Sequence, residues 1–365
     1  MEPASQRIRV LIAEDSAFMR MMIGKVLRED PAFEVIGYAA DGAEAVEKVA
    51  QLKPEAVTMD VEMPRMNGIE AVDRIMQRTP TPIVMLSSMT HRGAAVTIEA
   101  LAKGAVDFVP KPGSGAGGDL GAVAVELKDK LRRAASLNRF RLAAARVPPP
   151  RPVSAALRGN EPPTQHSALS TQHSTRSRSR RVVAIGTSTG GPAALTQLMA
   201  QLPADLTAGV LVVQHMPAGF TKALAERLDG LSPLCIREAA EGDQVEDGLV
   251  LVAPGDFHML VQPSGRVALT KDPPVHSVRP AADVLMSSVA RVYGRCSLGV
   301  VLTGMGHDGA DGATDIKKAG GQVMVQNEAT SVVYGMAASV VKAGSADAIL
   351  PLAQIAESIV RSLPG

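Results

Sequence analysis

The stretch Gly186-Thr187-Ser188-Thr189-Gly190 could present a nucleophilic serine. It follows the apolar run RVVAI, which predicts a buried strand that ends where the glycines begin. A strand that stops at Gly-x-Ser-x-Gly can expose its serine on a tight strand-to-helix turn, with backbone N–H groups directed at the same space. Such a serine also needs a base within hydrogen-bonding reach, an acid that orients the base, and donors for the oxyanion. The sequence therefore predicts covalent catalysis here if these partners exist.

Histidines that could act as the base occur at four positions in the same half of the chain: His215, His258, His276 and His307. His215 ends the apolar run GVLVVQ, so we expect it at the sheet edge where Ser188 emerges. The acid must come from the same edge. Asp308 follows shortly after the run SLGVVLTG, while Asp256 and Asp283 are alternatives. Position thus favours the triad Ser188, His215 and Asp308.

The order of these residues along the chain differs from that of a familiar serine hydrolase fold. An α/β-hydrolase with this turn runs Ser, then Asp or Glu, then His. That order would select Ser188, then Asp256 or Asp283, then His307. Its weakness is that His307 stands beside Asp308 in a glycine-rich turn instead of on a separate late loop. Both assignments stay open, and the turn motif alone does not determine the fold.

A second set of polar residues stands at the ends of apolar runs in the first half of the chain: Glu14, Asp15, Asp60, Ser87 and Lys111. The carboxyl ends of parallel strands meet at one sheet edge. Three carboxylates at one edge repel one another unless a cation lies among them, and Mg²⁺ prefers such oxygen ligands. Lys111 and the Ser87 hydroxyl are suited to receive the oxygens of a phosphoryl group. These residues predict a magnesium-dependent phosphoryl site.

Strand-like runs alternate with helical segments in two regions of the chain, which predicts two α/β domains with doubly wound parallel sheets. Expected strands are 8–13, 33–39, 55–60, 82–88 and 105–112, then 181–186, 209–214, 250–254, 297–304 and 322–326. The predicted domains are 7–139 and 182–365. Residues 140–181 between them are rich in Pro and Ser and hold eight arginines against one acidic residue, Glu161. This composition predicts a solvated, disordered linker.

The overall composition is that of a globular protein, with 46% hydrophobic and 21% charged residues among 365. A net charge of +1 argues against a nucleic-acid partner for the whole molecule. Two cysteines, Cys235 and Cys296, are too few for a disulfide framework or metal cage, so we expect a reducing cytoplasm. The start MEPASQRIRV lacks a signal-peptide pattern, and no apolar run reaches the roughly 20 residues of a membrane span. We therefore expect no membrane insertion.

The first half resembles two-component receiver domains over about residues 7–138. The resemblance rests on Glu14-Asp15, the run DVEMPRMNG (60–68), Ser87 and Lys111-Pro112. It implies a flavodoxin-like fold in which a histidine kinase phosphorylates Asp60 and Glu14, Asp15 and Asp60 hold Mg²⁺. Asp is common in the family where this chain has Glu14, a departure that concerns only the metal geometry.

Two further features of that half follow from the resemblance. Phe108 matches the aromatic position that changes rotamer on activation, with ordinary core packing as an equal alternative, so Phe108 joins Ser87 and Lys111 as a phosphoryl-sensing residue. The Lys111–Pro112 bond is a candidate for the cis form, which X–Pro bonds permit at about 0.5–1 kcal/mol.

The second half resembles the chemotaxis protein-glutamate methylesterases over about residues 182–359. The matching motifs are AIGTSTGGP, VVQHMP (212–217), VLTGMGHDGADG (301–312) and QNEATSVVYGM (326–336). The resemblance implies a Rossmann-like sheet with Ser188 as nucleophile, His215 as base and Asp308 as acid, and no cofactor in this domain. The backbone N–H groups of Thr189 and Met305 are the expected oxyanion donors. Only the segment 276–286 departs from the pattern, because Ala281-Ala282 replaces a Ser-Val pair.

The two resemblances together imply one function. It is the hydrolysis of glutamate γ-methyl esters on methyl-accepting chemotaxis receptors, together with deamidation of receptor glutamines, inhibited by the receiver until Asp60 is phosphorylated. A DNA-binding regulator would need a helix-turn-helix unit after the linker, where this chain has strand–helix alternation. A nucleotide-binding domain would have a phosphate-binding loop that ends in Gly-Lys-Ser/Thr, and the GTSTGG stretch lacks this ending.

Overall fold

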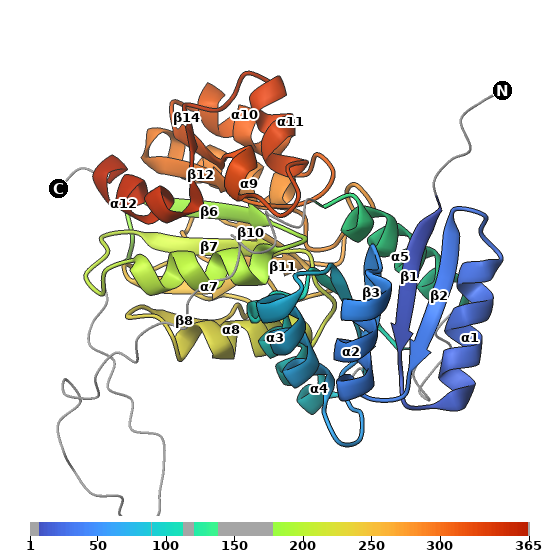
Figure 1. Ribbon diagram of the computed structural model, residues 1–365. Coiled ribbons are helices and arrows are strands. Elements are labelled where there is room, and N and C mark those ends of the chain that lie inside the picture. Colours follow the sequence, from blue (N-terminus) through green and yellow to red (C-terminus); the bar gives the residue numbers. More distant parts are fainter. Residues whose placement is uncertain (1–6, 89, 112–119, 138–177, 364–365) are drawn as a thin grey trace, which may run out of the picture.

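Two α/β units make up the structure, a computed structural model that describes residues 7–88, 90–111, 120–137 and 178–363 (Figure 1). The predicted fold class, two parallel-sheet α/β domains, is confirmed. Most of the predicted linker and the Lys111–Pro112 bond lie outside the described residues. No helix among the described residues is long and apolar enough to cross a membrane.

The first unit is a five-stranded sheet with the strand order β2-β1-β3-β4-β5, in which every pairing is parallel. This is the flavodoxin-like order. Its strands are β1 (Ile8–Ala13), β2 (Phe33–Ala39), β3 (Ala56–Asp60), β4 (Ile83–Ser87) and β5 (Asp107–Pro110). Its helices are α1 (Ala17–Arg28), α2 (Gly42–Leu52), α3 (Gly68–Arg78), α4 (His91–Ala102) and α5 (Leu120–Ala135).

The first four helices of this unit begin where the sequence supplies a capping side chain. A side-chain oxygen at each N-cap accepts a backbone N–H from the first turn, which satisfies a donor that the helix itself leaves free. The capping residues are Ser16, Asp41, Asn67 and Thr90. Local sequence therefore determines where these helices start.

The second unit is a seven-stranded parallel sheet with the order β14-β13-β12-β6-β7-β9-β8. Its strands are β6 (Val182–Thr187), β7 (Gly209–Gln214), β8 (Cys235–Glu238), β9 (Leu249–Val252), β12 (Ser297–Val301), β13 (Gln322–Gln326) and β14 (Ala348–Leu350). A separate antiparallel hairpin pairs β10 (His258–Val261) with β11 (Val267–Thr270). The helices are α7 (Gly191–Gln201), α8 (Phe220–Asp229), α9 (Ala282–Tyr293), α10 (Ala310–Lys318), α11 (Met336–Lys342) and α12 (Leu352–Ser362).

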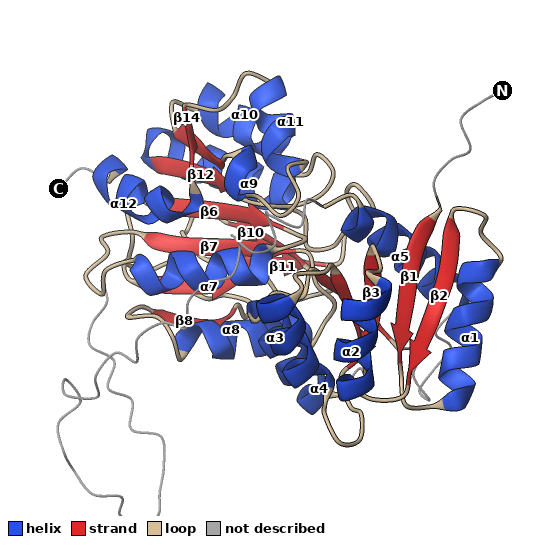
Figure 2. Ribbon diagram, in the orientation of Figure 1, coloured by secondary structure: helices blue, strands red, loops and turns tan. Residues whose placement is uncertain are grey.

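Helices cover both faces of this sheet, as Figure 2 shows. Alternate residues of β6 point to opposite faces. Val183 and Ile185 pack in the same core as Leu195 of α7, whereas Val182 and Ala184 pack in the core that holds Leu285 of α9. Because both faces are covered, the strand is an unbroken apolar run in which all six residues are buried.

Elements missed in the sequence lie mainly at the margins of the second unit. Strands β8 and β14 are four and three residues long and stand at the two ends of the sheet. Residues 178–181, which the composition assigns to the linker, belong to this unit. Arg178 bridges to Glu246, and the buried Ser179 hydroxyl donates to Asp247 and accepts from Gly209. Polar contacts, which composition does not reveal, hold this segment in place.

The two units pack against each other. Helix α4 of the first unit lies on α7 and α8 of the second (Figure 1). The Phe108 ring stacks on Phe220 with 4.3 Å between the ring centroids. The Thr189 hydroxyl donates a hydrogen bond of 2.6 Å to Oδ2 of Asp107. The start of β5 therefore contacts the turn that follows β6.

Candidate functional site

Ser188, His215 and Asp308 lie at the carboxyl edge of three neighbouring strands. Ser188 follows β6, His215 follows β7, and Asp308 stands between β12 and α10. The chain winds outward from β6 in both directions, and ligands of open parallel sheets bind at such a switch point. All three residues line a cavity of about 500 Å³ between the two units. The parallel sheet thus gathers residues that are up to 120 positions apart in the sequence.

Hydrogen bonds hold the turn that carries Ser188 between the loop after β12 and the end of β7. The Ser188 N–H donates to the Thr303 carbonyl at 3.1 Å, and Nε2 of Gln214 donates to the Ser188 carbonyl at 2.9 Å. Gly190 has a φ of +79°, in the left-handed region that favours glycine. A Cβ on Gly304 would lie 2.9 Å from Cβ of Ser188, so only glycine allows this approach. The turn is therefore fixed on both sides.

His215 and Asp308 are joined by a hydrogen bond. Nε2 of His215 lies 2.7 Å from Oδ2 of Asp308, whose side chain is 3% exposed. Burial raises the pKa of the Asp308 carboxyl, but the hydrogen bond and charge of His215 and two backbone N–H donors outweigh it and hold this pKa below its usual value. Asp308 is thus ionised and fixes the imidazole by Nε2, which leaves Nδ1 for the serine. Within the described residues the Ser188 hydroxyl makes no hydrogen bond to His215; such contacts often tighten only with substrate.

The other three histidines have different partners. His258 is buried, accepts the Ala281 N–H through Nδ1 at 3.2 Å and donates through Nε2 to the Pro273 carbonyl at 3.2 Å. His276 pairs with Asp283, and the exposed His307 packs edge-on against His276 with 4.2 Å between ring centroids. None of the three hydrogen-bonds to the Asp308 carboxylate among the described residues, so the geometry favours His215.

The hydrolase-order alternative is not assembled in the structure. In the described part of the chain, His307 makes no hydrogen bond to Asp256 or Asp283. Asp256 is exposed and pairs with Arg279 at 2.6 Å, which lowers the pKa of its carboxyl. The order Ser, His, Asp is therefore the one that the geometry supports.

The expected oxyanion donors both face the cavity. Thr189 and Met305 line it, and their backbone N–H groups donate no hydrogen bond to any residue that the structure describes. The side chain of Met305 is exposed, whereas that of Thr189 is held by Asp107. Two free N–H groups beside a serine are what an oxyanion hole requires.

The first unit gathers its predicted residues at the carboxyl edge of β1 and β3. Ligand oxygens of Glu14, Asp15 and Asp60 lie within 4.8 Å of one another. Nζ of Lys111 lies 2.8 Å from Oε2 of Glu14 and 2.8 Å from Oδ2 of Asp60. Burial, and then the charge of Asp60, raises the pKa of Glu14 to about 7 despite Lys111. Burial likewise raises the pKa of Asp60. One ammonium does not fully compensate the three carboxylates, so the site favours a divalent cation.

Ser87 and Phe108 contact elements away from this acidic site. The Ser87 hydroxyl accepts from Oγ1 of Thr97 at 2.6 Å and lies 3.2 Å from the Gly93 carbonyl, both in α4. It makes no hydrogen bond to Asp60 among the described residues. Phe108 is 3% exposed and packs on Phe220, so its side chain lies between the units. Both candidate sensing residues therefore contact elements that meet the second unit.

Sequence reasoning missed three residues that contact the nucleophile turn: Gln214, Thr303 and Asp107. Gln214 and Thr303 are buried polar residues at or just after the ends of apolar strands, which is a signal that the sequence contains. Asp107 comes from the other unit and also pairs with Lys130 at 3.1 Å. No local pattern could have placed Asp107 beside Thr189, because contacts between two domains produce no periodic pattern in the sequence.

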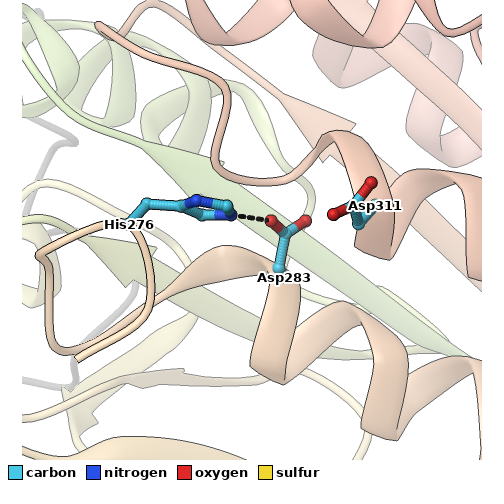
Figure 3. Close-up of side chains that lie close together, drawn as sticks. All are labelled: His276, Asp283 and Asp311. Atoms are coloured by element: carbon cyan, nitrogen blue, oxygen red, sulfur yellow. Dashed lines mark hydrogen bonds and ion pairs between the residues drawn. The ribbon is translucent and has the colours of Figure 1, made fainter. Parts of the chain in front are cut away.

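A second carboxylate cluster lies beside the triad. Figure 3 shows His276 directed at Asp283, with Asp311 next to them. Nε2 of His276 lies 2.8 Å from Oδ2 of Asp283, and ligand atoms of all three residues lie within 4.8 Å of one another. Burial and the charges of Asp308 and Asp311 raise the pKa of Asp283. The sequence offered Asp283 and His276 only as alternatives for the triad.

Comparisons with known proteins match both halves of the chain. Residues 183–359 match the CheB methylesterase family and residues 10–116 match the response regulator receiver domain family. A protein-glutamate methylesterase/protein-glutamine glutaminase of Symbiobacterium thermophilum is 50% identical over 98% of this chain and 97% of the relative.

Proteins of the same name from two other organisms are also similar. That of Pyrococcus abyssi is 43% identical over 98% of this chain and 94% of the relative, and that of Thermotoga maritima is 43% identical over 97% and 98%. The likeness spans the linker and both units. The chain, which joins a receiver domain to a methylesterase domain, therefore belongs to the protein-glutamate methylesterase/protein-glutamine glutaminase family.

Proposed function

We propose that this protein hydrolyses glutamate γ-methyl esters on methyl-accepting chemotaxis receptors. The observation that carries the proposal is the His215–Asp308 pair lining the same cavity as Ser188. Ser188 is the nucleophile, His215 the base and Asp308 the group that orients and stabilises the imidazole. Membership of the family supplies the substrate class.

The reaction proceeds in two halves. Nδ1 of His215 takes the Ser188 hydroxyl proton as the serine oxygen attacks the ester carbonyl, and the same proton leaves with methanol. Water, activated by His215, then releases the glutamate and regenerates the serine. The N–H groups of Thr189 and Met305 stabilise the oxyanion in both halves; losing one such donor typically costs about 2.7–4 kcal/mol.

Deamidation of receptor glutamines is a second activity of the same site. A glutamine side chain has the same length and carbonyl position as the methyl ester, so it fits the same cavity. The amide is less reactive and expels ammonia, to which His215 delivers the proton. The relatives carry both activities in their name.

The first unit receives a phosphoryl group on Asp60 from a histidine kinase. Glu14, Asp15 and Asp60 present clustered, partly buried oxygens that fit Mg²⁺. When bound, the cation neutralises the charge of the carboxylates and of the phosphoryl oxygens. Lys111 then pairs with the phosphoryl group, and Ser87 turns from Thr97 to donate to it.

The unphosphorylated receiver inhibits the esterase by occupying one side of the cavity. Asp107, Phe108 and Lys130 of the receiver line it opposite Ser188. Shifting a population from 1:99 to 99:1 needs about 5.5 kcal/mol of differential binding. Two or three charge-assisted hydrogen bonds to a phosphoryl group, at roughly 1.5–3 kcal/mol each, are sufficient. We place this reaction in the cytoplasm, and the free thiols of Cys235 and Cys296 support this location.

Release of methanol from a methylated receptor fragment tests the proposal. The full chain is compared with Ser188→Ala, with and without a small phosphoryl donor and Mg²⁺, and with Ser264→Ala, an exposed serine in the β10–β11 turn, as control. We expect Ser188→Ala to lose at least about 10³-fold in rate and Ser264→Ala to match the wild type. Methanol release that survives in Ser188→Ala would exclude the serine mechanism.

A further inference from the structure

Helices α9 and α10 each begin without a capping side chain of their own. Ala281 and Gly309 stand at the two N-cap positions, and neither provides a side-chain hydrogen bond. A helix start leaves four backbone N–H groups without an internal partner, and burial makes unpaired groups costly. Both starts are largely buried, so these donors require acceptors from elsewhere in the protein.

An aspartate from each helix start supplies the acceptor for the other. Asp308, just before α10, accepts the N–H groups of Ala282 and Asp283 in α9 at 2.6 and 2.9 Å. Asp283, in the first turn of α9, accepts through Oδ1 the N–H groups of Gly309 and Gly312 at 2.9 and 2.7 Å. The caps are reciprocal, and the orienting acid of the triad is one of the two partners.

We propose that Asp283, itself held by His276, is a positioning residue that sets where Asp308 stands relative to His215. The inference rests on the proposed triad. The loop that carries Asp308 also carries Met305, so Asp283 holds two parts of the catalytic machinery through one segment.

His276 completes the set of donors around Asp283. Its Nε2 bonds to Oδ2, while Oδ1 accepts the two backbone N–H groups, so both carboxylate oxygens are occupied (Figure 3). A metal ion at this cluster would displace the His276 hydrogen bond. Asp311 carries the same charge nearby but accepts no hydrogen bond from the described part of the loop. Comparing substitutions of Asp283 with a substitution of Asp311 therefore distinguishes the effect of the hydrogen bonds from the effect of the negative charge.

The expected consequence of losing Asp283 is displacement of the loop. Without its carboxylate the N–H groups of Gly309 and Gly312 lose their acceptor, and the start of α10 shifts to find another. Asp308 then moves away from the start of α9 and from His215. Misplacement of a catalytic group by about 1 Å costs on the order of 10²-fold in rate.

Steady-state methanol release by the phosphorylated full chain tests this inference. We expect Asp283→Ala to lower kcat by about 10²-fold with a much smaller change in KM, because Asp308 and the Met305 N–H act mainly on the transition state. Asp283→Asn retains an amide oxygen that can accept the two loop N–H groups, so it should recover most of the loss, to within roughly fivefold of the wild type. The matched control is Asp311→Asn, which removes the neighbouring charge and should behave as wild type.

A readout on the enzyme alone keeps the inference separate from the proposed function. The proton on Nε2 of His215, hydrogen-bonded to Asp308, gives a proton NMR signal in histidine-labelled protein that His215→Ala identifies. We expect this signal to shift or broaden in Asp283→Ala and to stay in Asp311→Asn. That result would support the positioning role even if the wild type released no methanol from receptors.

Two results would overturn the inference. One is a folded Asp283→Ala variant, with a cooperative thermal transition, that keeps both the wild-type kcat and the His215 signal. The other is an Asp311→Asn variant as impaired as Asp283→Ala, which would make the charge of the cluster the cause. If Asp283→Ala does not fold, Asp283→Asn decides: a loss of about 10²-fold in kcat together with loss of the His215 signal in that variant would contradict the explanation by the two loop hydrogen bonds.

Discussion

Each of the two sheets gathers carboxylates at the carboxyl ends of its strands, but the pKa values of Glu14 and Asp60 in the first unit and of Asp308 in the second are shifted in opposite directions. In the first unit, burial raises the pKa of Glu14 to about 7 and also raises that of Asp60, with Lys111 as the counter-charge. In the second unit, His215 and two backbone N–H groups hold the pKa of Asp308 below its usual value. One edge gathers carboxylates that lack sufficient compensation, and the other pairs its carboxylate fully.

The difference follows from what each site has to do. A site that receives a cation and a phosphoryl group gains binding free energy when ligands supply the missing charge, so undercompensated carboxylates suit it. A hydrolytic site gains rate when its groups are already in position and need no rearrangement in the transition state. Parallel sheets provide both, because the topology determines where side chains meet and the sequence determines their pairing.

Asp308→Asn tests the fully paired edge most severely. The amide keeps the shape of the carboxylate but has one acceptor oxygen for three N–H donors, so it no longer stabilises a protonated His215. We expect the esterase rate to fall by about 10⁴-fold, as for the corresponding change in serine proteases. Methanol release measures the loss. A variant that keeps a tenth of the wild-type rate would show that Asp308 is not the orienting acid.

Asp60→Asn tests the undercompensated edge. It removes the oxygen that accepts the phosphoryl group while keeping the size of the side chain. We expect a small phosphoryl donor with Mg²⁺ to stimulate the wild type by roughly tenfold or more. The variant should not respond, because without phosphorylation nothing supplies the about 5.5 kcal/mol that shifts the population from the inhibited to the active state. The ratio of stimulated to unstimulated rate is the measurement. Stimulation that persists in the variant would mean that another residue is phosphorylated.

Much of the fold could be predicted because its information is local. Strands 209–214 and 322–326 have the predicted bounds, since burial on both sides leaves unbroken apolar runs. Strands β8 and β14 were missed because they are short and stand at the two ends of the sheet, where only partial burial leaves no continuous apolar run. The reciprocal caps of Asp283 and Asp308 were also missed, since each aspartate caps a helix to which it does not belong.

The contacts between the units are the part that sequence could not supply. Strand ends gave Ser188, His215 and Asp308 as neighbours, because parallel strands meet at one edge. Asp107 and Phe220 carry no such signal. Their roles depend on how two separately patterned sheets dock, and that docking rests on a few pairs such as Phe108–Phe220 and Asp107–Thr189.

Asp107→Ala tests whether docking links the two edges. The Asp107 carboxylate accepts the hydroxyl of Thr189, next to the nucleophile, and its loss should favour the undocked state. A hydrogen bond to a charged group contributes about 1.5–3 kcal/mol, part of which solvent restores, so we expect the unphosphorylated rate to rise roughly three- to tenfold. Methanol release without a phosphoryl donor measures this rise.

Asp129→Ala is the matched control for that substitution. Asp129 lies on α5, pairs only with Arg132 and Arg133 among the described residues, and does not line the cavity. Its removal takes away one negative charge of the same unit and should leave the unphosphorylated rate unchanged. Equal rises in the two variants would indicate a general electrostatic effect and not the contact with Thr189.

Met305→Leu should have the smallest effect, because the two sites differ in whether side chains or backbone groups act. In the proposed mechanism of the first unit the side chains of Lys111 and Asp60 act directly, so truncating either should remove the function. At the proposed oxyanion site the donor is the backbone N–H of Met305, while the side chain of this residue is 38% exposed. Leucine keeps that N–H and a similar volume, so we expect kcat within about twofold of the wild type. A tenfold loss of kcat would show that the thioether contacts the substrate, and the role of Met305 would then be assigned to its side chain.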